Sequence, residues 1–135
     1  MKKAGYKELR VYNLAYELSL RIHKLSKNFP VEERYSLTDQ VRRSSRSVCA
    51  NIGEGYRKRM YPKHFAKKLI DSNGEATETK IWLDYSKDLG YISLADYESL
   101  YQQYESVGNM LAIMIDHPEK FLPRSSKTKT SDPNP

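Results

Sequence analysis

Few residues in this chain have both the type and the spacing that catalysis needs. The single cysteine, Cys49, lies among small residues in a helical stretch, where a packed thiol is far commoner than a nucleophile. His23, His64 and His117 fall on or beside three different expected helices, with no second ligand at the spacing of a metal site. We therefore expect no enzyme activity, no metal and no cofactor.

A glycine pair near the end of the second expected helix needs an explanation, because each glycine costs about 1 kcal/mol relative to alanine in a helix. One interpretation is that the glycines let another helix approach closely, with polar neighbours hydrogen-bonded across the bundle or a subunit contact. The other makes Glu54 an acid or base, but the sequence identifies no partner for it. We favour a structural motif formed by Asn51, Gly53, Glu54 and Gly55.

Charge is distributed unevenly along the chain, which carries +6 overall with a pI near 9.3. Residues 34–68 hold ten basic side chains against two acidic ones, a net +8. Residues 71–105 hold eight acidic side chains against two basic ones, a net −6. We expect one basic and one acidic region, which could steer a polyanion or let subunits meet head to tail.

The basic residues, with Tyr56 and Tyr61 among them, could hold phosphates and stack bases. A solvated helix face would also explain these basic residues. Arg42, Arg43 and Arg46 could instead pair with carboxylates of a neighbouring subunit. The candidates for nucleic-acid binding are Arg42, Arg43, Arg46, Arg57, Lys58, Arg59, Lys63, Lys67 and Lys68.

Four stretches of helical periodicity separated by short breakers must position these residues. The apolar stripes and breakers predict helices over residues 8–28, 36–58, 62–89 and 94–117. Ser36 and Ser93 are expected to cap the second and fourth helices, and Pro62 suits the first turn of the third. Short connections between amphipathic helices predict an all-α, antiparallel up-down-up-down four-helix bundle.

The predicted core faces repeat every three or four residues along each helix. They comprise Val11, Ala15, Leu18, Ile22, Leu25 and Phe29, then Leu37, Val41, Val48 and Ile52, then Phe65, Leu69, Ser72, Ala76, Thr79 and Leu83, and last Leu94, Tyr97, Tyr101, Tyr104, Gly108, Leu111 and Ile115.

The chain's length and composition suit one domain over residues 1–118, followed by a disordered polar tail over 119–135. No apolar stretch approaches the roughly 18 residues that a membrane span needs, and no signal peptide precedes the first helix. One cysteine cannot form an intrachain disulfide. We expect a cytoplasmic protein with no membrane partner.

The segment from Gln40 to Gly55, QVRRSSRSVCANIGEG, resembles the signature of the four-helix bundle family named for the 23S rRNA-intervening-sequence protein. That signature runs Gln-x-Arg-Arg-Ser, then Ser-Ile, then Asn-Ile-Ala-Glu-Gly. Phe29-Pro30 with Glu33, the stretch 74–78 and Leu89-Gly90-Tyr91-Ile92 are similar to the family as well. The likeness covers about residues 6–118. Three positions depart from it, where Gly53 replaces Ala, Tyr61 replaces a Ser cap and Glu75 replaces Ser.

The resemblance implies an antiparallel four-helix bundle that assembles into a ring-shaped homopentamer, like the related accessory variability determinant of diversity-generating retroelements. That relative is a basic, nucleic-acid-associated partner of a reverse transcriptase. The fold alone does not decide function. Two hypotheses therefore stay open: a non-enzymatic oligomeric module that binds RNA or DNA, and a structural or protein-interaction bundle, such as an accessory subunit of a reverse transcriptase or another protein.

Overall fold

A computed structural model describes residues 4–123, which contain four α-helices, three short 3-10 helices and no strand. The α-helices lie within two residues of the predicted bounds. The elements in chain order are η1 (Gly5–Glu8), α1 (Arg10–Ser26), η2 (Val31–Glu33), α2 (Leu37–Arg57), α3 (Pro62–Asp88), α4 (Leu94–Asp116) and η3 (Pro118–Phe121).

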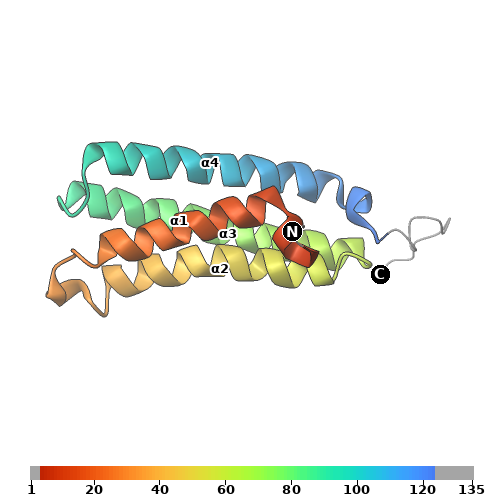
Figure 1. Cartoon of the computed structure of the whole chain (residues 1–135), viewed down its shortest axis with the longest axis horizontal. Coiled ribbons are helices and arrows are strands. Elements are labelled where there is room, and N and C mark those ends of the chain that lie inside the picture. Colours follow the sequence, from red (N-terminus) through yellow and green to blue (C-terminus); the bar gives the residue numbers. More distant parts are fainter. Residues whose placement is uncertain (1–3, 124–135) are drawn as a thin grey trace.

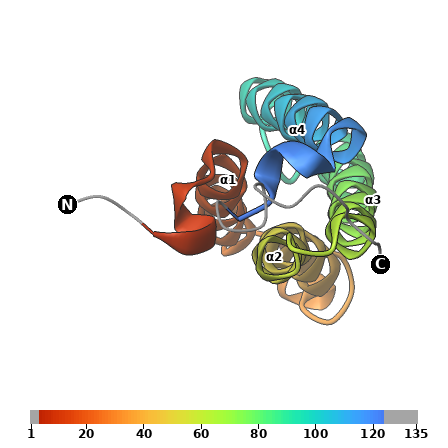
Figure 2. The ribbon, with the colours of Figure 1, turned by 90° about the vertical axis from the view of Figure 1, so that its right-hand side faces the viewer.

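The four helices run alternately in opposite directions, which confirms the predicted bundle (Figure 1). Each helix contacts the next along the chain, and α4 returns to contact α1. Viewed along the bundle, the helices occupy the four corners of a square in chain order (Figure 2). η1, the α2–α3 turn and η3 all lie at one end, and η2 lies at the other.

The core faces of the first three helices are those that the sequence predicts. Ala15, Leu18, Ile22, Val48 and Ile52 are at most 2% exposed. On α3, all six predicted core residues are buried. Leu25 and Phe29 are half-buried and pack against this core.

The core face of α4 is only partly as predicted. Leu94 is 60% exposed, and Tyr97, Tyr101, Gly108 and Ile115 are half-buried. The fully buried stripe of α4 shares only Tyr104 and Leu111 with the predicted stripe. Both stripes repeat at the same helical spacing, so the spacing alone fits either one. The fully buried stripe consists of Leu100, Tyr104, Val107, Leu111 and Met114.

The N-terminal caps of α2 and α4 differ. Ser93 accepts a hydrogen bond from the Asp96 backbone N–H at 3.0 Å, so the predicted cap of α4 is confirmed. The Ser36 side chain makes no cap bond to α2, and that prediction is wrong. The Glu33 carboxylate replaces it, because its Oε1 accepts both the Ser36 hydroxyl at 2.6 Å and the Leu37 backbone N–H at 3.3 Å.

Small side chains and hydroxyl groups line the contact between α2 and α3, the most extensive helix contact in the bundle. The Ser72 hydroxyl donates to the Val48 carbonyl at 2.8 Å, and Thr79 donates to the Ser44 hydroxyl at 2.8 Å. All three hydroxyl-bearing residues are buried. Since each hydroxyl has a partner, these polar groups avoid the penalty of unsatisfied burial.

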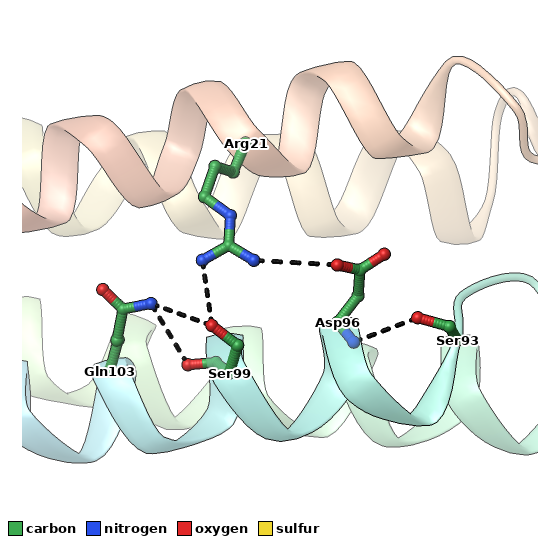
Figure 3. Close-up of polar contacts among 5 residues, drawn as sticks. All are labelled: Arg21, Ser93, Asp96, Ser99 and Gln103. Atoms are coloured by element: carbon green, nitrogen blue, oxygen red, sulfur yellow. Dashed lines mark hydrogen bonds and ion pairs between the residues drawn. The ribbon is translucent and has the colours of Figure 1, made fainter.

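The α1–α4 contact is the least extensive of the four and carries a polar cluster at its edge (Figure 3). Arg21 donates to the Ser99 hydroxyl at 3.2 Å and lies 3.9 Å from the Asp96 carboxylate. Gln103 donates to the same Ser99 hydroxyl at 3.2 Å. These contacts fix α1 against the first half of α4 at a partly solvated seam.

The folded unit continues beyond the predicted boundary at residue 118. Pro118–Phe121 forms η3, and the Phe121 ring lies 5.7 Å from that of Phe65 in the core. The rest of the predicted tail, residues 124–135, lies outside the described residues. Within residues 4–123, no helix has the length and apolar character needed to cross a bilayer.

Replacing Leu18 with Ala should destabilise the fold by about 2 to 5 kcal/mol, because the side chain is 1% exposed and its removal leaves a cavity. Leu20→Ala is the matched control on the same helix, since Leu20 is 53% exposed, and should cost at most about 0.5 kcal/mol. Urea unfolding measures both changes. Equal losses in the two variants would contradict the assigned faces of α1.

Candidate nucleic-acid interface

The nine predicted basic residues form two groups rather than one continuous site. Six lie where α2 ends and α3 begins, next to η1 (Figure 1). Arg42, Arg43 and Arg46 lie in the first half of α2. Along the helix, Arg46 and Arg57 are about 16 Å apart.

Two of the three arginines in the first half of α2 contact α1. Arg42 donates to the Ser26 hydroxyl at 2.8 Å and to the His23 carbonyl at 3.4 Å. An Arg46 guanidinium nitrogen lies 3.2 Å from His23 Nδ1. Partial burial, followed by the charge of Arg42, lowers the pKa of His23, so the neutral ring can accept from Arg46. These arginines therefore connect helices within the chain.

Three of the six basic residues at the α2–α3 end also have partners. Lys68 Nζ lies 2.8 Å from Glu54 Oε1, and its hydrogen bond and charge lower the pKa of Glu54. Lys67 Nζ lies 3.5 Å from Asp71 Oδ1. Arg59 lies over the Tyr56 ring, 4.0 Å from its centroid, and donates to the Tyr56 carbonyl at 3.0 Å.

The remaining three residues at this end, Arg57, Lys58 and Lys63, are exposed and form no ion pair within the part of the chain that the structure describes. Arg43 is also exposed. Burial is the main cause of the raised pKa of Glu75, and the Arg43 charge partly offsets it. Of the nine predicted residues, three of the four that lack a partner among the contacts described above therefore lie at the turn between α2 and α3.

The glycine motif explains how these two helices meet. A Cβ on Gly55 would lie 2.9 Å from the Cβ of Lys68, so this glycine permits close helix contact as predicted. A Cβ on Gly53 would lie 3.6 Å from the Tyr6 ring, an ordinary contact with η1. Glu54 pairs across to α3, whereas Asn51 donates within α2 to the Ser47 carbonyl at 2.9 Å.

A groove between η1, α1 and α2 was not predicted from the sequence. We call it the tyrosine groove because the rings of Tyr6, Tyr12 and Tyr16 line it, and its volume is about 410 Å³. Arg46 and Arg57 border it as well. Its other lining residues are Ser19, Cys49, Ala50, Gly53 and Glu54.

Cys49 lines this groove but is only 7% exposed. Burial raises the pKa of Cys49 to about 11, so the thiol is neutral near pH 7 and lacks the thiolate that a nucleophile needs. In residues 4–123, no group of three His, Cys, Asp or Glu side chains has the arrangement of a metal site. The groove therefore presents aromatic rings, guanidinium groups and the Glu54 carboxylate, which is paired with Lys68, as its accessible chemistry.

Alanine substitutions at the two glycines should have opposite effects. Gly53→Ala should stabilise the fold by up to about 1 kcal/mol, because it improves helix propensity and its Cβ has room beside Tyr6. Gly55→Ala should destabilise by about 1 to 3 kcal/mol, because its Cβ would collide with that of Lys68. Thermal unfolding of both variants tests the assignment. A loss at Gly53 and none at Gly55 would contradict the helix approach described above.

Comparisons with known proteins place these features in a family. The family model for the 23S rRNA-intervening sequence protein matches residues 7–113, which include nearly all of the bundle. A crystal structure of a protein with unknown function from the S23 ribosomal protein family of Bacteroides thetaiotaomicron is similar, with a TM-score of 0.70 and 29% identity. The match covers 78% of this chain and 97% of that one. No curated protein matches. The resemblance in the sequence is therefore confirmed, and this chain belongs to the family of the 23S rRNA-intervening sequence protein.

Proposed function

We propose that this protein is a non-enzymatic, cytoplasmic homo-oligomer that binds RNA or DNA at the α2–α3 end of the bundle. The observation that carries the proposal is the set of exposed, unpaired cations Arg57, Lys58 and Lys63. Such groups can neutralise phosphates and release counterions without breaking ion pairs within the protein.

The nearby acids support the same proposal. Glu54 and Asp71 are already paired with Lys68 and Lys67. Their negative charge is therefore partly compensated, which leaves Arg57, Lys58 and Lys63 as cations at this turn without an ion pair in residues 4–123. Affinity should come mainly from phosphates, so sequence preference should be weak.

A second apolar stripe on α3 supports self-association. Ile70 is 55% exposed, Ile81 44% and Tyr85 53%, and the exposed small residues Gly74 and Thr77 lie between them at helical spacing. The stripe is about 22 Å long, enough to pack against a second helix. The family resemblance points to a pentamer, in which five copies of the basic end would combine their fields.

The same stripe favours a second candidate function, a protein-interaction bundle that does not bind nucleic acid. In that case the partner of the exposed α3 face would be a different protein, such as a reverse transcriptase, and the bundle would be its accessory subunit. The two functions differ in whether purified protein binds an oligonucleotide.

Changing Arg57, Lys58 and Lys63 together to Gln should weaken nucleic-acid binding and flatten its salt dependence. The logarithmic salt slope should fall by about 0.9 on duplex, or about 0.7 on a single strand, for each phosphate that the variant no longer neutralises. Fluorescence anisotropy at about 50 to 200 mM salt measures both quantities.

The matched control changes Lys24, Lys27 and Arg34 to Gln, since these exposed cations lie toward the opposite end of the bundle. The control should keep the wild-type slope. Equal weakening of both triple variants would contradict the site. No binding by wild type at moderate salt would overturn the nucleic-acid function and favour the protein-interaction bundle.

The double variant Ile70→Asp with Ile81→Asp should be monomeric where the wild-type protein is oligomeric, because assembly would bury the two new carboxylates without partners. Light scattering should then give the 15.8 kDa mass of one chain. Val31→Asp is a control, since Val31 is 72% exposed in η2, away from this stripe. A wild-type protein that is monomeric at micromolar concentration would contradict self-association.

A further inference from the structure

Three hollows on the surface meet at one arginine. Arg57 borders the tyrosine groove, a second hollow of about 440 Å³ and a third of about 300 Å³. The second hollow is lined by Ala4, Gly5, Tyr6, Lys7, Tyr56, Arg57 and Arg59. The third is lined by Arg57, Lys58, Tyr61 and His64. Tyr6 also belongs to both of the first two hollows, so these adjoin.

Each hollow combines at least one tyrosine ring with at least two cations. In the tyrosine groove, the Tyr6 and Tyr12 rings meet edge to face with centroids 4.8 Å apart. The Tyr12 and Tyr16 rings are stacked at 6.0 Å with an interplanar angle of 21°. Tyr16 is 48% exposed and Tyr61 in the third hollow is 54% exposed, so both rings retain accessible surface.

We infer that these hollows form a track for single-stranded nucleic acid, in which unpaired bases stack on the tyrosines and phosphates contact Arg57 and the cations beside it. The inference rests on the proposed function and specifies its ligand. Aromatic platforms alternating with positive charge are the usual means of holding single strands. The volumes of 300 to 440 Å³ suit compact groups rather than a continuous duplex surface.

The chemistry of the lining favours a strand with exposed bases over a duplex or an acidic peptide. Duplex bases are already stacked on one another and would leave the tyrosine rings unused. A peptide carboxylate would use only the cations. Glu54 is the one acid lining the three hollows, and its pairing with Lys68 limits its repulsion of phosphates.

The test compares wild-type binding of a 12-nucleotide oligo-dT, an abasic strand of the same length and charge, and a 12-base-pair duplex. Fluorescence anisotropy should show oligo-dT binding at least about fivefold more tightly than the abasic strand, because only oligo-dT offers bases for stacking. The duplex should also bind more weakly than oligo-dT. Polyglutamate should compete less well than oligo-dT at equal charge.

The double variant Tyr16→Ala with Tyr61→Ala should lose at least about fivefold in affinity for oligo-dT. Its affinity for the abasic strand and its salt slope should not change, since the cations remain. Tyr35→Ala is the matched control, because Tyr35 is 86% exposed and lies in the connection at the opposite end of the bundle. Circular dichroism melts of all variants show whether the fold is intact.

The outcomes separate this inference from the function on which it rests. Equal binding of oligo-dT and the abasic strand, or an oligo-dT affinity unaffected by the tyrosine changes, would overturn the stacking track and leave phosphate binding in place. Polyglutamate that competes as well as oligo-dT would also overturn it. Failure of all three nucleic-acid probes to bind would instead overturn the nucleic-acid function itself.

Discussion

The close contact between α2 and α3 is the constraint on which the candidate site depends. Gly55 has no room for a Cβ beside Lys68. The buried hydroxyls of Ser72 and Thr79, both on α3, also donate hydrogen bonds to α2 across this contact. The connection between α2 and α3 is short, spanning residues 58–61. The last residues of α2 therefore lie beside the first residues of α3. Cations separated by several positions in the chain thereby come to one end of the bundle.

Some of these cations are already engaged in hydrogen bonds or ion pairs within the described part of the protein, and others are not. Arg42 and Arg46 contact α1, and Lys68 pairs with Glu54 across the α2–α3 contact. Exposed ion pairs contribute little to stability, so their larger effect here is to compensate the nearby acids. The proposed binding surface consists of the remaining cations at the α2–α3 turn together with tyrosine rings from η1, α1, α2 and that turn.

The four helices could be predicted because apolar residues repeat at helical spacing and glycine or proline separates the repeats. The exact face of α4 could not be, since two stripes of the same period share Tyr104 and Leu111 and differ only in which neighbours are buried. The α2 cap also depends on a tertiary detail, the reach of Glu33 to Leu37. The cluster at the α2–α3 turn was visible in the charge pattern, but the tyrosine groove was not. Its rings come from η1 and α1, and only folding brings them to Gly53 and Arg57.

The most direct test of the central claim is to locate the bound nucleic acid on the protein. Ultraviolet cross-linking of a single-stranded oligonucleotide to the wild-type protein, followed by mass spectrometry of the peptides, gives that location. We expect cross-links in peptides that contain Tyr6, Tyr16, Tyr56 or Tyr61. Cross-links confined to the opposite end of the bundle, around Tyr35 and Tyr85, would contradict the account.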